Sequence, residues 1–183
     1  MTATAERVFP SLRADFPILD TVVRGHPLAY LDNAATTQKP RAVLDAVVDY
    51  YTTANSNIGR GYYQLSMTAT DRYEQARGEV QRWLNAENPE EIVFTRGTTD
   101  AVNLVADTFA RGRVGPGDDV VVTGLEHNSN LLPWRRLCEA SGARLVVVPV
   151  DRDGRVDPAD FSAALGARTR LAAVAHVSNV LGT

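Results

Sequence analysis

Lysine is almost absent from this chain of 183 residues: of its 19 basic residues, only Lys39 is a lysine, and the others are arginines. An enzyme that forms an imine needs a lysine amine, so Lys39 is the only candidate for that chemistry here. Cysteine is equally scarce. Cys138 stands alone, which excludes a disulfide within the chain and predicts a reducing, cytoplasmic location.

Long apolar runs and an excess of positive charge are also missing. No apolar run approaches the roughly 18 residues that a membrane-spanning helix needs, and residues 1–6 lack the pattern of a secretory signal. The net charge of −3 offers no basic surface for nucleic acid. We therefore expect neither a membrane nor a nucleic acid as a partner, and we expect no metal site.

The composition that is present, 44% hydrophobic and 22% charged, is that of a globular protein with a real core. From residue 91 onward, short apolar runs alternate with amphipathic segments. Repeated strand–helix–strand units predict an α/β fold with a mostly parallel sheet. The expected strands are 91–95, 120–122, 145–148 and 171–177, and the expected helices are 98–110, 129–141 and 158–165.

The first part of the sequence is less regular. We expect a small pair of strands at 22–23 and 28–31, a helix that begins at Pro40 and a helix over about 66–85. The inward face expected for the last of these helices carries Tyr73, Ala76, Val80, Trp83 and Leu84. The expected domains are an N-terminal segment over residues 1–60 and the first part of a larger α/β domain over residues 61–183.

Polar residues follow four of the expected strands at their carboxyl ends, where open parallel sheets bind ligands. These segments are 32–37, 96–99, 126–130 and 178–179. In the second segment, Gly97 and two threonines lead into a helix. The unpaired N–H groups of that helix start and the hydroxyls of Thr98 and Thr99 converge on a point that favours a phosphate.

Each of these residues also has an ordinary structural interpretation. A Gly-Thr-Thr turn is a common helix cap, an isolated histidine such as His127 often only satisfies a neighbouring helix start, and Asn179 is typical of a turn. Arg60, between two glycines, is also compatible with a solvated loop charge. Cys138 lies inside an expected helix and is interpreted as a small buried apolar residue.

Four motifs, taken together and in order, resemble the N-terminal half of a cysteine desulfurase of the SUF type, in the class V aminotransferase family. The resemblance covers nearly the whole chain, and the last motif is the most specific. It implies a three-layer PLP-transferase-like fold, truncated here after its first strands, with pyridoxal 5′-phosphate (PLP) as the cofactor. The motifs are Leu28-Ala29-Tyr30-Leu31-Asp32-Asn33-Ala34-Ala35-Thr36, Arg96-Gly97-Thr98-Thr99, Glu126-His127-Asn128-Ser129-Asn130 and His176-Val177-Ser178-Asn179-Val180-Leu181-Gly182-Thr183.

The resemblance also implies a role for single residues. Thr98 and Thr99 match the residues that hold the cofactor phosphate. His127 matches the catalytic histidine that stacks on the pyridine ring and relays protons, and Asn179 matches the asparagine that hydrogen-bonds the ring's phenolic oxygen. Ala34 and Arg60 match positions near the substrate. The chain departs from the family at Gly59, where a histidine usually precedes that arginine.

The activity implied by the resemblance converts L-cysteine to L-alanine and an enzyme-bound persulfide, which a sulfur-acceptor protein then receives for iron–sulfur cluster assembly. The implied enzyme is a cytoplasmic homodimer. Its Schiff-base lysine and persulfide cysteine lie beyond the last motif, and neither Lys39 nor Cys138 matches them. We therefore expect this chain to be an N-terminal fragment that is inactive alone.

Other hypotheses stay open beside this one. Within the family, the enzyme is alternatively a related PLP lyase, a selenocysteine lyase or an epimerase. Outside catalysis, the chain is alternatively a binding or scaffold module on the same fold. A dinucleotide-binding Rossmann domain is disfavoured, because Gly112-x-x-Gly115-x-Gly117 precedes a strand instead of following one.

Overall fold

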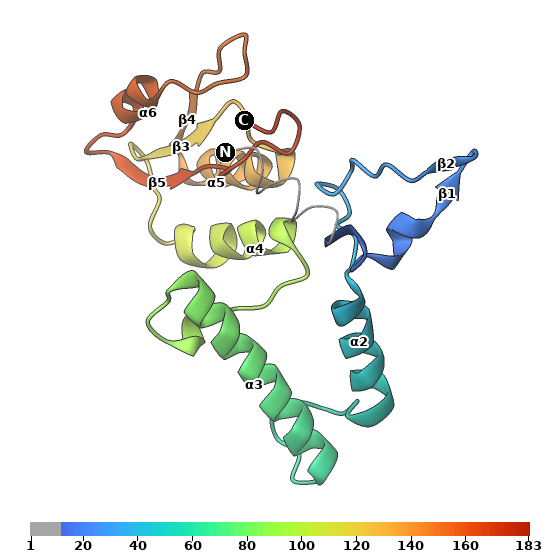
Figure 1. Cartoon of the computed structure of the whole chain (residues 1–183). Helices are drawn as coiled ribbons and strands as arrows, with labels where there is room; N and C mark the ends of the chain where they lie inside the picture. The colour runs from blue at the N-terminus through green and yellow to red at the C-terminus, as the bar shows by residue number, and fades with distance from the viewer. Residues whose placement is uncertain (1–11) are drawn as a thin grey trace. The chain divides into compact units, whose positions relative to one another are not determined.

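The computed structural model describes residues 12–183, and its contacts divide the chain into two compact units (Figure 1). The first unit ends at Val93, and the second runs from Phe94 to Thr183. The expectation about residues 1–6 lies outside the described residues. The domain boundary expected between residues 60 and 61 concerns the family's larger domain and stays a prediction.

A tight antiparallel hairpin opens the first unit, after the 3-10 turn η1 (Pro17–Asp20). Strand β1 (Val22–Val23) pairs with β2 (His26–Pro27) across Arg24 and Gly25, which both have positive φ. The prediction of a second strand at 28–31 is wrong. A two-residue turn of this kind brings the chain back at once, so the pairing begins at residue 26. Beyond Pro27 the N–H of Leu28 still donates to the Thr21 carbonyl at 2.9 Å, but residues 28–31 form no strand.

Two helices and a short 3-10 turn make up the rest of the first unit: α2 (Arg41–Thr53), α3 (Gln64–Leu84) and η2 (Pro89–Glu91). Pro40 is the N-cap of α2, and α3 ends where Asn85 takes the left-handed conformation. The inward face expected for α3 is wrong at its carboxyl end: Trp83 is 88% exposed and Leu84 59% exposed. Ala76, earlier on the same expected face, is exposed as well.

The second unit is an α/β arrangement around a three-stranded parallel sheet, which confirms the expected fold class (Figure 1). Strand β3 lies in the centre, between β4 and β5, and joins both through parallel ladders. The elements in chain order are α4 (Thr98–Val105), the π-helical segment η3 (Ala106–Ala110), β3 (Asp119–Thr123), the 3-10 turn η4 (Asn128–Asn130), α5 (Leu132–Ser141), β4 (Arg144–Val148), α6 (Pro158–Ala164) and β5 (Thr169–Ala173).

The core of the second unit forms on one face of β3. Val120 and Val122, which alternate on that strand, pack against Ala106 and Ala110 of η3 and against Trp134, Leu137 and Cys138 of α5. Cys138 is only 4% exposed, and its burial raises the pKa of its thiol. The interpretation of this cysteine as a small buried apolar residue is confirmed.

The strand expected at 91–95 is wrong. Residues 92–95 follow η2 and precede α4, and no ladder with any described strand includes them. The guanidinium of Arg77, on α3, donates to the carbonyl oxygen of Ile92. A β-strand exists only with a neighbour, and the apolar, β-branched composition of this segment does not supply one.

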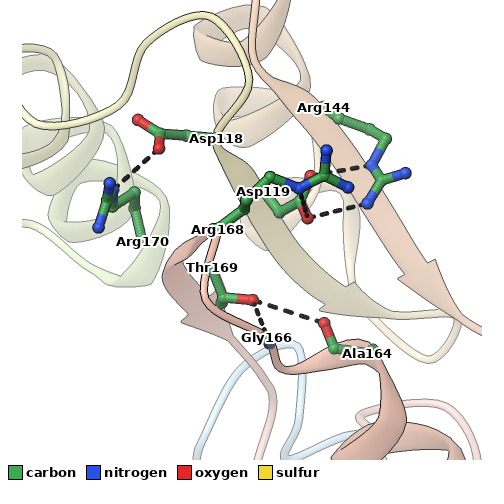
Figure 2. Close-up of polar contacts among 8 residues, drawn as sticks. All are labelled: Asp118, Asp119, Arg144, Ala164, Gly166, Arg168, Thr169 and Arg170. Atoms are coloured by element: carbon green, nitrogen blue, oxygen red, sulfur yellow. Dashed lines mark hydrogen bonds and ion pairs between the residues drawn. The ribbon is translucent and has the colours of Figure 1, made fainter.

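Charged residues tie the strands together at their amino ends (Figure 2). Asp119, the first residue of β3, accepts two hydrogen bonds of 2.8 Å from the Arg144 guanidinium on β4, and Nε of Arg168 lies 3.8 Å from the same carboxylate. Beside it, Asp118 pairs with Arg170 of β5 at 2.9 Å. This cluster joins the three strands at their amino ends, and the carboxyl ends of the strands lie on the opposite side of the sheet.

Candidate functional site

The phosphate-binding turn expected at residues 96–99 takes shape at the start of α4. Gly97 has φ +154° and ψ −179°, a conformation that L-residues rarely adopt, and a Cβ built on it would meet nothing within 4 Å. The backbone conformation, and not the available space, therefore selects glycine here. The next residue, Thr98, already begins the helix.

No side chain among the described residues caps this helix start. The threonines are the first two helical residues and do not act as its N-cap, so the ordinary capping interpretation is wrong. The N–H groups of the first turn therefore stay available to a ligand. The carboxylate of Asp100 instead accepts the N–H of Arg96 at 3.3 Å, which closes the turn around Gly97.

His127 lies in the turn after β3, as the N-cap of η4. Its Nδ1 accepts the backbone N–H of Ser129 at 3.2 Å and lies 2.8 Å from the Ser129 hydroxyl. Since a backbone N–H only donates, Nδ1 acts as the acceptor, and the neutral ring carries its proton on Nε2. The side chain is exposed, so Nε2 is accessible to a ligand.

Thr99 and His127 line one cleft of about 510 Å³, between α4 and the η4–α5 region. The structure thus brings together two of the residues expected to bind the cofactor. Asn103 also lines this cleft and links α4 to α5. The nitrogen of its side-chain amide donates to the Thr99 carbonyl at 2.8 Å, and the amide oxygen accepts from Arg136 at 3.0 Å. Thr98 does not line this cleft and lies beside it, as the neighbour of Thr99.

Two arginines in this cleft were not expected from the sequence. Arg135 and Arg136 of α5 both line it, beside the positive end of a helix. Each has an acidic neighbour that partly balances its charge: Arg135 lies 3.7 Å from Glu139, which lines the same cleft, and Arg136 lies 3.8 Å from Asp107. Their signal in the sequence was weak, because two adjacent arginines on a helix resemble an ordinary solvated surface. Only the packing of α5 beside α4 shows that they share a cleft with Thr99.

Asn179 comes after β5, which runs parallel to β3, so it lies at the same edge of the sheet as the His127 turn. The buried hydroxyl of Ser178 accepts the N–H groups of Val180 and Leu181 and folds this segment into a turn. Asn179 itself is exposed and does not line the cleft. Its role at the phenolic oxygen stays a prediction.

Ala34 and Arg60, the residues expected near the substrate, belong to the first unit. Arg60 lines a cavity of about 950 Å³ with Tyr50, Tyr63 and Tyr73. Its loop is fixed on α3, because Ser66 donates to the Asn57 carbonyl at 2.7 Å and Gly59 donates to the Thr70 hydroxyl at 2.9 Å. The substrate roles of Ala34 and Arg60 stay predictions.

The chemistry of the cleft fits a phosphorylated, planar cofactor. A dianion would gain from the uncapped N–H groups of α4, the hydroxyls of Thr98 and Thr99 and the nearby arginines. An exposed imidazole in the same cleft offers a flat surface and a ring N–H. A cofactor with a phosphate and a flat ring, such as PLP, would fit this set of groups.

The comparison with known proteins then decides the family. The model of the aminotransferase class-V family matches residues 29–183. The chain belongs to this family. Its members depend on PLP, which confirms the expected cofactor for the family.

The most similar class-V relatives found are cysteine desulfurases. A probable cysteine desulfurase of Halalkalibacterium halodurans is 49% identical over 168 residues, which are 92% of this chain and 41% of that protein. A cysteine desulfurase of an Enterobacter species is 48% identical over 172 residues, 94% of this chain and 42% of that protein. The apo structure of a cysteine desulfurase from Thermococcus onnurineus superposes with a TM-score of 0.85 at 38% identity, covering 94% of this chain and 41% of that one.

These relatives confirm the resemblance found in the sequence. The chain spans about two fifths of the length of the class-V relatives that it matches. Among residues 12–183, no helix combines the length and the apolar character needed to cross a membrane.

Proposed function

We propose that the protein carrying this chain is a PLP-dependent cysteine desulfurase, which converts L-cysteine to L-alanine and an enzyme-bound persulfide. One observation carries the proposal: Thr99, at an uncapped helix start, and His127 line the same cleft. Two relatives named as a probable cysteine desulfurase and a cysteine desulfurase, at 49% and 48% identity, support the choice of substrate.

In this proposal the start of α4 holds the cofactor phosphate. The N–H groups of its first turn and the hydroxyls of Thr98 and Thr99 donate to the phosphate oxygens, and the helix dipole favours the negative charge. Gly97 allows the backbone to reach this geometry. Arg136, anchored on Asn103 at 3.0 Å, adds a positive charge at the edge of the cleft.

When bound, PLP supplies an electron sink for the negative charge that develops on the α-carbon of the substrate. The imidazole of His127 packs on the ring and holds or moves a proton at Nε2, because Nδ1 is occupied by Ser129. The side-chain amide of Asn179 donates to the phenolic oxygen. Arg60 and Ala34 contribute to the substrate side, and this is the least constrained part of the proposal.

The reaction breaks the bond between carbon and sulfur in cysteine and transfers the sulfur to a thiolate of the enzyme. Cys138 does not suit that role: it is 4% exposed, and burial raises the pKa of its thiol, whereas a nucleophilic cysteine needs a lowered pKa and access. Lys39 donates to the carbonyl of Thr37, in the loop before α2. We therefore assign the imine-forming lysine and the persulfide cysteine to residues other than Lys39 and Cys138.

The wider assignments belong to the same proposal. A homodimer, a sulfur-acceptor protein, a role in iron–sulfur cluster assembly and a cytoplasmic location follow from the kind of enzyme that the relatives are. A different substrate preference, such as one for selenocysteine, would arise at Gly59, the loop position where the family usually has a histidine.

The test uses the complete gene product, because the relatives are much longer than this chain. We expect a visible absorbance with PLP that borohydride abolishes, and release of sulfide from L-cysteine when a thiol is present. A protein that stays colourless with PLP, or that releases selenide but no sulfide, contradicts the proposal.

The residue-level test is Thr99→Val, with Thr108→Val as its control. Thr108 is an exposed threonine of η3 whose hydroxyl only donates to the Leu104 carbonyl. Loss of one hydrogen bond to a charged phosphate costs about 1.5–3 kcal/mol, so we expect T99V to weaken PLP binding about 10- to 100-fold. Equal affinities for T99V and T108V, measured by the quenching of protein fluorescence, would contradict the assignment.

A further inference from the structure

The side chain of Glu126, the residue before His127, accepts three hydrogen bonds from three different segments of the chain. Its Oε1 accepts the Thr123 hydroxyl at 2.7 Å and the backbone N–H of Ala175 at 3.0 Å. Its Oε2 accepts the side-chain amide of Asn130 at 2.7 Å. One half-buried carboxylate thus joins the end of β3, the end of η4 and the segment after β5.

The orientation of Asn130 in this network is fixed by the core. The indole N–H of Trp134 can only donate, and it donates to Oδ1 of Asn130 at 3.0 Å. The amide nitrogen of Asn130 must therefore face Glu126. Since Trp134 is 3% exposed and packs against Val120 and Val122, the carboxylate is tied through Asn130 to the buried core of the unit.

This network encloses His127. The bond between Glu126 and Asn130 closes a loop whose interior is residues 127–129. Inside that loop, His127 Nδ1 accepts the N–H of Ser129. Glu126 therefore fixes both ends of the turn in which Ser129 donates to Nδ1 of His127. This donation leaves the proton of the neutral ring on Nε2.

The same carboxylate also decides where β5 ends. The ladder between β3 and β5 stops at Val122 and Ala173, and the N–H of Ala175 goes to Glu126 instead of to a strand. The expected strand 171–177 therefore ends at Ala173, and the chain turns there toward Ser178 and Asn179. Glu126 links the turn that carries His127 to the segment that carries Asn179.

We propose that Glu126 is the positioning residue of this site: it fixes the pose and the protonated nitrogen of the His127 ring and couples that ring to the segment leading to Asn179. The geometry stands on its own, and only the benefit to catalysis rests on the proposed function. Glu126 touches neither cofactor nor substrate in this proposal and acts through His127.

The test is a pair of complementary substitutions. Glu126→Gln places an amide NH₂ opposite the NH₂ of Asn130, so two donors face each other. Asn130→Asp places two carboxylates opposite each other. The double variant E126Q/N130D restores one donor opposite one acceptor, keeps the total charge, and still offers an oxygen to the Trp134 N–H.

The readout is the pair of ¹⁵N chemical shifts of the His127 ring at alkaline pH, without PLP. The measurement uses the complete gene product, and the His127→Gln variant identifies the His127 signals by their absence. We expect E126Q and N130D each to move both ring shifts toward those of free histidine, and the double variant to return them to the wild-type values. Glu79→Gln is the matched control, because Glu79 is 75% exposed and pairs only with Arg82 on α3.

A second readout is the affinity for PLP, which we expect to fall about tenfold in E126Q and to recover in the double variant. Unchanged ring shifts in folded E126Q, or a double variant that does not restore them, overturn the proposal. If a single variant fails to fold, the double variant decides alone: it must fold and show the wild-type ring shifts. Failure of wild-type protein to bind PLP overturns the proposed function only, since the ring shifts are measured without the cofactor.

Discussion

Gly97 is the residue on which the phosphate-binding turn depends most directly. Its φ of +154° lets the chain turn from the extended segment 92–95 into α4 without a capping side chain. A side chain here would meet no neighbour within 4 Å, so the restriction comes from the backbone alone. Gly97 is therefore the N-cap residue that leads the chain into α4 just before Thr98 and Thr99.

We therefore predict that Gly97→Ala lowers the free energy of unfolding by about 1–3 kcal/mol, the usual cost of a strained backbone conformation. Urea denaturation followed by circular dichroism measures this change. Gly112→Ala is the matched control, because a Cβ there also meets nothing within 4 Å but no unusual φ is required. A loss of stability that is equal in the two variants would contradict the backbone explanation.

At the same scale, the sequence predicted the candidate site residues better than their surroundings. The types of Thr98 and Thr99 and their place before a helix indicated a phosphate site, whereas the role expected for His127 came from the family resemblance; Thr99 and His127 do share a cleft. The bond from Ser129 to Nδ1 of His127 is local, between residues two apart, and agrees with the interpretation of His127 as a residue that satisfies a helix start. The approach of Arg136 to Asn103 was not predictable, because it depends on how α5 packs beside α4, which no local pattern encodes.

Strand β3 organises the second unit at the scale of elements. All five of its residues are buried, and its first residue, Asp119, joins β4 through Arg144. The hydrogen bond from Arg144 holds the pKa of the Asp119 carboxyl below its ordinary value, against the opposing effect of burial. The ion pair between Asp119 and Arg144, at the amino ends of their strands, thus helps to fix β4 as a neighbour of β3.

The lowered pKa of Asp119 predicts an acid-dependent loss of stability. A carboxyl with a lower pKa in the folded state stabilises the fold above its unfolded-state value, and this contribution is lost as the pH falls through the folded pKa. We expect the wild-type melting temperature to fall between about pH 5 and about pH 2, and to fall less steeply in Asp119→Asn. Asp153→Asn, at an exposed loop residue with no ion pair among those described, is the control and should keep the wild-type slope.

The accuracy of the strand predictions has a simple physical pattern. The expected strands 120–122 and 145–148 are present. The first is fully buried and has a partner on each side, whereas the second lies at the edge of the sheet and its Val147 is 50% exposed, so an apolar run does not by itself bury a strand. The strand 171–177 is present only to Ala173, and 91–95 and 28–31 are absent as strands. Composition predicts an extended backbone. A β-strand also needs a neighbouring strand and backbone N–H groups that are not already bonded elsewhere.

Helix ends were predicted more accurately, because their signals are local. Gly142 ends α5 in the left-handed conformation with φ +73°, and Asp157 caps α6 by accepting the N–H of Ala159 at 2.7 Å. The sequence carries both signals locally: a glycine directly follows the expected helix 129–141, and Asp157 directly precedes Pro158 at the start of the next expected helix. A cap is decided within a few residues, whereas a strand pairing is decided between distant segments.

At the scale of the whole molecule, each of the two units contains one of the two tryptophans. Trp83, at the end of α3, is 88% exposed, and Trp134, in the core beside β3, is 3% exposed. The two residues therefore report separately on the two units.

We predict that acrylamide quenches the fluorescence of Trp83 strongly and that of Trp134 weakly in the native chain. Trp83→Phe and Trp134→Phe isolate the two signals, and urea should abolish the difference between them. Strong protection of Trp83 in the 183-residue chain would show that this end of α3 is covered, for example by a second copy, and would contradict the exposed position described here.

The sequence by itself determined the α/β class, the family and the types of residue that hold a phosphate, because these depend on local patterns: alternating apolar segments, a Gly-Thr-Thr turn before a helix, and four ordered motifs. Tertiary structure decided which strands have partners, that Thr99 and His127 share a cleft, and that Glu126 ties the His127 turn to the segment after β5. These contacts join segments far apart in the chain, so only the packing of the folded unit creates them.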